Sequence, residues 1–314
     1  MARLIISRIL STIPLLFVLS LLTFSMVHLM PGSIAVIILD AGATPEAIAE
    51  LETEMGLDRP FLIQYFDWLR SAFQGDFGDS LFFGAPVREL ITESWSVTAS
   101  IVIGGMVVGI ALGLFLGIVA GLQPGSYLDR FSTVGASFGV AIPSFWLGMM
   151  LAIVLGVQLE LFPVIGYTAF AESPTGWLYS ITLASLAMGI PSAALIARQM
   201  RSSMANVLQS SYIRAQRAMG LGSWQIVVRH ALKNAMIPVV TVIGFRLAVV
   251  IGQAFIVENV FVLPGLGRQL ATAVQQQDVI FVQGGTIVVA AFIVFANMFI
   301  DIIYGFLNPK VRVS

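Results

Sequence analysis

Long stretches without any charged residue recur along this chain, and they limit its fold more than any other feature. Only 11% of the residues are charged, whereas ordinary soluble domains carry about 25%. A helix needs roughly 20 predominantly apolar residues to cross a bilayer, and each stretch is at least that long. The stretches are Ile9–Leu39, Ser94–Leu128, Phe131–Leu159, Ser173–Ala197, Asn234–Val257 (interrupted by Arg246) and Val279–Ile300. We therefore predict an all-α integral membrane protein with six transmembrane helices.

The first stretch has some features of a secretion signal, because Arg3 and Arg8 precede it and Ala41-Gly42-Ala43 resembles a cleavage site. The apolar part of a signal peptide is only about 7–15 residues long. Ile9–Leu39 is much longer, so we expect an uncleaved first transmembrane helix.

The basic residues predict how the helices are oriented. If the N-terminus is cytoplasmic, the external loops hold only Arg59, Arg70, Arg88 and Arg268, and the internal segments hold all other basic residues outside the spans. Of the 17 acidic residues, 11 lie between Asp40 and Glu93, in the first external loop. Cytoplasmic loops carry an excess of Lys and Arg, so both termini are predicted to be cytoplasmic.

The sequence lacks the residues that several common metal-binding and nucleotide-binding sites need. It has no Cys, and its only histidines are His28 and His230, which excludes a thiolate metal site and an HExxH zinc site. Its only lysines, Lys233 and Lys310, lie outside any Gly-Lys-Ser/Thr sequence, so a Walker A loop is absent. We expect no catalytic residue, metal site or cofactor in this chain.

The first external loop is predicted to be helical. Thr44 and Pro45 are typical of a helix start, Gly56 of a helix end, and Pro60 of a second start. That second helix should pack one apolar stripe, formed by Phe61, Tyr65, Leu69 and Phe73. The loop could be a packed lid or a platform for an external partner, and its acidic composition does not choose between them.

The segment Arg198–Lys233 contains six basic residues and no acidic one. Ser210 or Ser211 can cap a short helix, Gly220 and Gly222 can stop it, and Ser223 can cap the next. One face of the short helix would carry Leu208, Tyr212, Ala215 and Met219. Such a helix suits a groove on a protein partner and equally an anionic lipid surface, and the pattern alone leaves both open.

Aligned on Gly220, this segment resembles the EAA loop of bacterial ABC-importer permeases. The positions of the loop's Glu-Ala-Ala and Ile-x-Leu-Pro groups are occupied here by Arg214, Ala215, Gln216, His230, Leu232 and Lys233. With these residues the segment resembles the version of the loop found in the dipeptide/oligopeptide/nickel branch of the family. The long loop after the first span resembles that of the DppB/OppB-type subunit of this branch. Seven further motifs also resemble the branch: Met30-Pro31-Gly32, Gly56-Leu57-Asp58-Arg59-Pro60, Gly75-Asp76-Phe77-Gly78-Asp79-Ser80, Pro143-Ser144-Phe145-Trp146-Leu147-Gly148, Val257-Glu258-Asn259-Val260-Phe261, Pro264-Gly265-Leu266-Gly267 and Asn308-Pro309-Lys310-Val311-Arg312.

The resemblance implies a type I ABC-importer permease fold in the bacterial plasma membrane. In that family a homologous second permease, two cytoplasmic ATPases that hold ATP and Mg, and an external solute-binding protein complete the importer. The lipid bilayer surrounds the permeases, and no nucleic acid takes part. The residues implied in coupling to the ATPases are Tyr212, Arg214, Ala215, Arg217, Met219 and Gly220. The chain would divide into residues 1–30 (cytoplasmic end and first span), 31–93 (external helical loop) and 94–314 (permease core, with the coupling loop at 198–236).

Polar residues within the apolar stretches are predicted to face the translocation path or a partner helix. A charge facing lipid at the depth of Arg246 costs at least ~2.5 kcal/mol, so Arg246 either contacts substrate or pairs with an acid of the sister subunit. Gln253 lies on the same helical face, and Asn297 and Asp301 lie four residues apart on the last span. Glycines about four residues apart favour close helix contact; they are Gly104, Gly105, Gly109, Gly113 and Gly117.

The predicted substrate is a small peptide, moved by alternating access. A nickel chelate or glutathione is an alternative cargo for the same mechanism. An ion-coupled secondary transporter is less favoured, because such proteins carry inverted repeats and intramembrane acids that the sequence scarcely offers. A membrane-anchored receptor needs far fewer spans than six.

Overall fold

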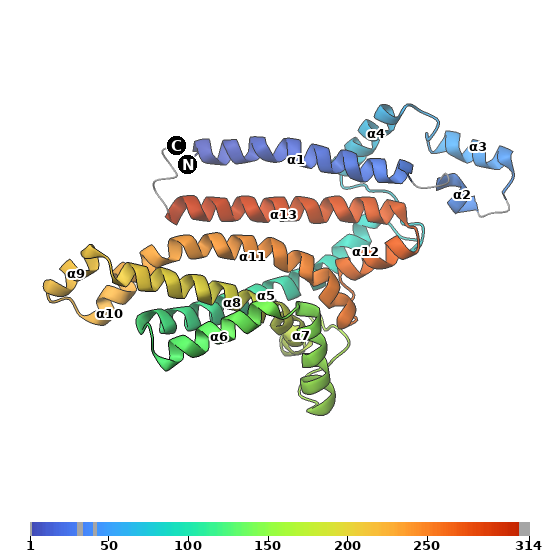
Figure 1. Cartoon of the computed structure of the whole chain (residues 1–314). Helices are drawn as coiled ribbons and strands as arrows, with labels where there is room; N and C mark the ends of the chain where they lie inside the picture. Colours follow the sequence, from blue (N-terminus) through green and yellow to red (C-terminus); the bar gives the residue numbers. More distant parts are fainter. Residues whose placement is uncertain (1, 30–33, 40–42, 308–314) are drawn as a thin grey trace. The chain divides into compact units, whose positions relative to one another are not determined.

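The computed structural model describes residues 2–29, 34–39 and 43–307, and its regular elements within these ranges are all helices (Figure 1). The chain forms two compact units. One comprises Ser96–Arg268 with residues from both ends of the chain, and the other comprises Ile9–Trp95 and Gln269–Val294. The motifs Met30-Pro31-Gly32 and Asn308-Pro309-Lys310-Val311-Arg312 lie outside the described residues.

Each predicted apolar stretch contains at least one helix. The helices before the basic segment are α1 (Ala2–Leu29), α2 (Ile34–Leu39), α3 (Pro45–Glu54), α4 (Phe61–Phe73), α5 (Val87–Leu122), α6 (Tyr127–Ala141), α7 (Ser144–Leu151) with its π-helical continuation Ala152–Gln158, and α8 (Pro174–Leu208). The remaining helices are α9 (Ser211–Ala218), α10 (Ser223–Gln225), the π-helical segment η2 (Ile226–Ala231), α11 (Leu232–Val260), α12 (Leu266–Gln275) and α13 (Val279–Leu307).

Helix length and composition support the membrane assignment. Among the described residues, 4 helices are long and apolar enough to cross a bilayer, or 5 if the bent pair α6 and α7 counts as one span, and α1 holds a shorter apolar stretch at Leu10–Met26. The apolar side chains at the surface include Leu10 and Phe115, which are 61% and 65% exposed. In a bilayer such side chains meet lipid or a partner helix, so their exposure is expected.

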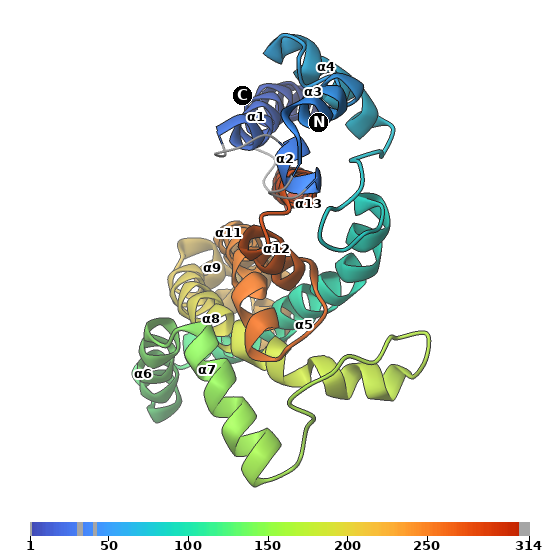
Figure 2. The same cartoon turned by 90° about the vertical axis from the view of Figure 1, so that its right-hand side faces the viewer.

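The third apolar stretch does not form the continuous helix that its composition predicts. α6 ends at Ala141, Pro143 precedes α7, and the two helices meet at 101°. Proline lacks an N–H and disfavours helical geometry at the residue before it, and Ile142 is accordingly extended, with ψ 122. Figure 2 shows α7 turning sharply away from α6.

The glycine-rich face of α5 packs against α8, as predicted. A Cβ on Gly109 would lie 2.8 Å from the Ser192 side chain, and one on Gly117 would lie 2.6 Å from that of Met200. Only glycine permits this approach of two helices, which buries both backbones.

The segment predicted to form the first external loop is helical, with one correction to its predicted packing. Thr44 accepts a hydrogen bond from Ala47 N and caps α3, as predicted. Tyr65 of α4 is buried, and its hydroxyl lies 2.8 Å from Ser20 Oγ of α1. The stripe does not extend to Phe73, which is 85% exposed. The ring contacts that join α4 to Phe24 of α1 come from Phe61, Tyr65 and Trp68.

Candidate functional site

The basic segment is partly a continuation of α8 and partly a separate short helix. Residues from Arg198 to Leu208 extend α8, and α9 follows, with Ser210 at its N-cap position. The Ser210 hydroxyl donates to Val207 O rather than accepting from α9, and Gly222 takes the N-cap position before α10. The prediction that Ser223 caps the second helix is therefore wrong, because the chain enters that helix one residue earlier.

One side chain anchors α9 to the rest of its unit. Ile213 is fully buried in a cluster with Ile226, Ala231 and Ala235. Burying such a side chain contributes roughly 1.5–3 kcal/mol, which offsets the low intrinsic stability of so short a helix. Ile213 was absent from the predicted apolar face, because a helical pattern does not reveal which apolar residues pack against the rest of the same chain and which stay exposed.

The predicted coupling residues lie on the surface of α9 and at its end. Tyr212 is 38% exposed and Met219 72% exposed, and Arg214, Ala215, Arg217 and Gly220 are exposed as well. Trp224, at the start of α10, is 79% exposed. Trp224 is not among the predicted coupling residues, although a Trp in a basic, glycine-flanked turn is a detectable sign of a contact surface. We call Tyr212, Met219 and Trp224 the exposed apolar face of the loop.

A polar contact joins α9 to the following long helix. Asn234 Nδ2 of α11 donates to the Tyr212 hydroxyl at 2.8 Å, and also to His230 O at 3.3 Å. Ile213 packs on η2 and α11 as well, so both apolar packing and a hydrogen bond join α9 to the start of α11.

Further along α11, Arg246 is a buried cation without an acidic partner among the described residues. It is 6% exposed. Its Nε and Nη2 donate to Ser192 Oγ of α8 at 3.3 and 2.9 Å. The described ion pairs involve other residues, namely Arg59 with Asp67 and Arg201 with Asp129. A buried charge is costly unless it is paired, and one serine hydroxyl does not neutralise Arg246.

Arg246 lines a cavity at the break between α6 and α7. The cavity holds about 300 Å³, and Gln253 of α11 and Ser144 at the start of α7 are among its lining residues. Gln253 Oε1 is buried without a hydrogen-bond partner among the described residues. Thus two of the four residues predicted for the translocation path, Arg246 and Gln253, share one cavity.

The other two predicted path residues are not brought to this cavity by the described structure. Asn297 lies on α13 with an exposed side chain. Asp301 also lies on α13, and its side chain falls outside the described residues. Their assignment to the path stays a prediction.

Two polar contacts that the sequence did not reveal brace this unit. Arg201 of α8 makes two hydrogen bonds to Asp129 of α6, at 2.7 and 2.8 Å. Glu258, fully buried at the end of α11, accepts from Thr98 Oγ1 at 2.6 Å and from Arg268 N at 3.0 Å. The partners in the first pair are 72 residues apart in sequence, so no local pattern could join them.

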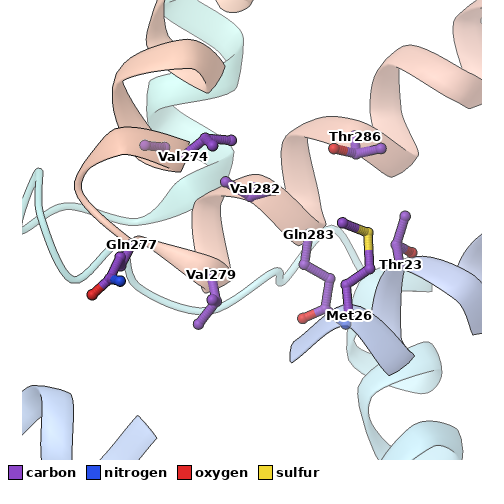
Figure 3. A pocket seen from close by; sticks show the side chains of 9 residues that line it. Thr23, Met26, Val274, Gln277, Val279, Val282, Gln283 and Thr286 are labelled. Carbon is purple, nitrogen blue, oxygen red and sulfur yellow. The ribbon is translucent and has the colours of Figure 1, made fainter. Parts of the chain in front are cut away.

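A second cavity of about 160 Å³ lies in the other unit, between α1, α12 and α13 (Figure 3). Its lining is mostly apolar, including Met26, Val274 and Val282. Gln283 also lines it, and its Nε2 is buried without a hydrogen-bond partner among the described residues. No charged side chain lines this cavity among the described residues, which makes it a weaker candidate for a hydrophilic solute than the Arg246 cavity.

The helical membrane fold and the family matches together define the class, an integral membrane component of a transport system. The family model "Binding-protein-dependent transport system inner membrane component" matches residues 113–313, and the model of that family's N-terminal region matches residues 1–101. The chain belongs to this family, the permeases of ABC importers, whose members are not themselves catalytic.

Curated relatives extend over nearly the whole chain. The dipeptide transport system permease protein DppB of Alkalihalophilus pseudofirmus is 35% identical over 325 residues, covering 97% of this chain and 98% of the relative. The DppB protein of Escherichia coli is 35% identical over 336 residues, covering 99% of each. Among solved structures, an amino acid ABC transporter with histidines aligns with a TM-score of 0.51 and 14% identity over 71% of this chain and 94% of that one. This last likeness shows the type I permease fold and nothing further.

Proposed function

We propose that this chain is one of two permease subunits of a bacterial plasma-membrane importer that moves small peptides, driven by ATP hydrolysis on partner subunits. The named relatives transport dipeptides, which favours peptides over a nickel chelate or glutathione. An external binding protein would deliver the solute, and the family description supports that partner. ATP and Mg would be held by the ATPases, and this chain would bind no cofactor.

The exposed apolar face of the loop is the observation that carries the mechanism. Met219 and Trp224 are more than two-thirds exposed, at 72% and 79%, while Ile213 of α9 is fully buried in its own unit. A short helix that is anchored through Ile213 and has exposed apolar side chains at and just beyond its end suits the groove of a protein partner. The arginines on α9 would face acidic groups of that partner or its water-filled rim.

Motion at this helix has a physical route to the translocation path. An ATPase that shifts α9 acts through Ile213 and the Tyr212–Asn234 hydrogen bond on the start of α11. The same helix carries Arg246 and Gln253 into the cavity at the α6–α7 break. Two arrangements of α11, biased by nucleotide on the ATPases, would provide inward- and outward-open states.

A comparison of loop variants tests the proposal in the assembled importer. The double variant Met219→Ala/Trp224→Ala should lower ATPase co-purification and ATP-dependent dipeptide uptake into proteoliposomes by roughly tenfold or more, as expected for lost interface anchors. Its unfolding temperature should not change, because both side chains are exposed. Phe73→Ala, which removes an equally exposed aromatic ring from the predicted external loop, should leave ATPase binding and uptake intact.

Three results would count against the proposal. Uptake of dipeptide by the unmodified complex that does not require ATP would contradict the ATP-driven mechanism. Preferential uptake of a nickel chelate or glutathione would replace the substrate. Unchanged ATPase binding by the double variant would remove the loop from the ATPase interface and favour a lipid-facing surface.

A further inference from the structure

We propose that Arg246 and the cavity beside it form a subsite for the C-terminal carboxylate of the transported peptide. This inference rests on the proposed function for the identity of the substrate, but the charge preference of the cavity follows from the structure alone. The central observation is a guanidinium that is 6% exposed, lines a cavity of about 300 Å³ and has no acidic partner among the described residues.

The hydrogen bonds of Arg246 leave part of its donor capacity open. Nε and Nη2 both donate to the one Ser192 hydroxyl, and no hydrogen bond involves Nη1 among the described residues. Guanidinium presents its donors in a planar fork that matches a carboxylate with two parallel hydrogen bonds. Ser192 is itself fully buried and donates to Met188 O within α8. It therefore fixes the orientation of the guanidinium without supplying a negative charge.

The remaining lining of the cavity fits the same ligand. α7 begins at Ser144, which lines the same cavity as Arg246, and no side chain caps this helix start. Helix starts carry partial positive charge, and broken membrane helices of transporters direct such ends at anionic substrate groups. Arg246 and the start of α7 therefore act with the same sign, and both favour an anion.

Gln253 gives the subsite a direction. It follows Arg246 by two helical turns, which is about 10 Å along α11, and its buried Oε1 has no partner among the described residues. A peptide extends about 3.3–3.6 Å per residue. With its carboxylate on Arg246, a di- or tripeptide would place an N–H group within reach of Gln253 Oε1. Carboxylate and amide would then be held by different residues of one helix.

Charge-selective labelling tests the cavity without depending on transport. Because this chain has no Cys, Gln253→Cys introduces one thiol whose labelling is measured on this chain within the full complex. An anionic methanethiosulfonate should react roughly tenfold faster than a cationic one, after correction for their rates with a free thiol, given a cation about 10 Å away in a site of reduced dielectric. Adding Arg246→Gln to this variant should abolish the preference.

Peptide competition then identifies the group that Arg246 binds. A dipeptide with a free carboxylate should slow labelling of the introduced cysteine, and its C-terminal amide should not. Equal rates for the two reagents would overturn the proposal, because they would mean that a protein carboxylate neutralises Arg246 in the assembled importer. Equal protection by dipeptide and dipeptide amide would overturn the carboxylate assignment.

Uptake provides the third measurement. Arg246→Gln should reduce the initial rate of dipeptide uptake roughly tenfold or more, as loss of a charge-assisted bidentate contact predicts, and Arg246→Lys should restore part of it. Arg130→Gln makes the same substitution at an exposed position of α6 and should transport at the unmodified rate. Uptake by Arg246→Gln at the unmodified rate would contradict the subsite.

The outcomes separate this inference from the proposed function. If the unmodified complex imports no peptide, the proposed function fails, while the labelling preference still shows whether the cavity selects anions. If peptide import is normal but labelling shows no preference, only the subsite fails. Should Arg246→Gln not assemble with the ATPases, the Arg246→Lys variant and the labelling of Gln253→Cys decide the question.

Discussion

At the scale of single residues, Gly220 is required for its backbone conformation. Its φ of +82 lies in the left-handed region, and a Cβ there would meet nothing within 4 Å. The obstacle to other residues is therefore backbone strain rather than lack of space, and it costs on the order of 1 kcal/mol for Ala and more for β-branched residues. Gly220→Asn should be tolerated best, because Asn adopts this conformation most readily among the other residues.

The predicted effect of Gly220 substitutions is on coupling rather than assembly. Gly220→Val should leave the complex assembled and lower ATP-dependent uptake several-fold, with Gly220→Ala intermediate. Gly222 has an ordinary φ of −63 and equally open surroundings, so Gly222→Ala is the matched control and should behave as the unmodified chain. Equal uptake by the Val variant and the control would show that the turn does not transmit force.

Glu258 is a second residue whose effect follows from its contacts. Its carboxylate accepts hydrogen bonds from Thr98 and from the backbone of Arg268, and Thr98 Oγ1 accepts one from Leu266 N. Glu258→Ala leaves buried donors unpaired and should destabilise the fold by about 3 kcal/mol or more. Glu258→Gln keeps one acceptor and should cost less.

Thermal unfolding in detergent measures this effect, with Glu50→Ala as a control at an exposed position of α3. An unfolding temperature for Glu258→Ala equal to that of the control would show that the hydrogen bonds at the end of α11 do not stabilise the fold.

At the scale of elements, the Asp129–Arg201 pair fastens α6 to α8. Asp129 has a side-chain exposure of 5% and Arg201 one of 36%, and the Asp129 carboxylate also accepts from Gly125 N at 2.8 Å. A half-buried bidentate pair should show a coupling free energy of about 1–3 kcal/mol, between the values for exposed and buried pairs.

A double-mutant cycle of Asp129→Ala and Arg201→Ala, followed by unfolding, measures this coupling. The Arg59–Asp67 pair offers a control, since its side chains are 58% and 63% exposed and its coupling should lie below about 1 kcal/mol. Equal coupling in the two cycles would mean that the α6–α8 contact rests on apolar packing alone.

At the scale of the whole molecule, the sequence predicts where the helices lie better than it predicts which helices pack together. Apolar stretches locate the membrane helices, Thr44 locates the start of α3, and the glycines of α5 predict a close helix contact that α8 supplies. The 101° break at Pro143 was missed, because transmembrane helices often contain proline without breaking there. The Arg246 cavity lies at the same break. The sequence therefore predicted that Arg246 faces inward, but it did not predict the cavity that Arg246 lines.

The orientation of the chain is a prediction for the whole molecule, and the absence of Cys makes it easy to test. The bias of basic residues places α3 outside and α10 in the cytoplasm. Glu50→Cys and Gln225→Cys both introduce a thiol at an exposed position, one in each segment. In intact spheroplasts an impermeant maleimide should label Glu50→Cys and leave Gln225→Cys unlabelled until the membrane is permeabilised.

Val250→Cys, at a fully buried position, should stay unlabelled in both conditions and serves as the accessibility control. The reverse labelling pattern would place α9 and α10 outside the cell, where no ATPase could reach them, and would contradict both the orientation and the coupling role of the loop.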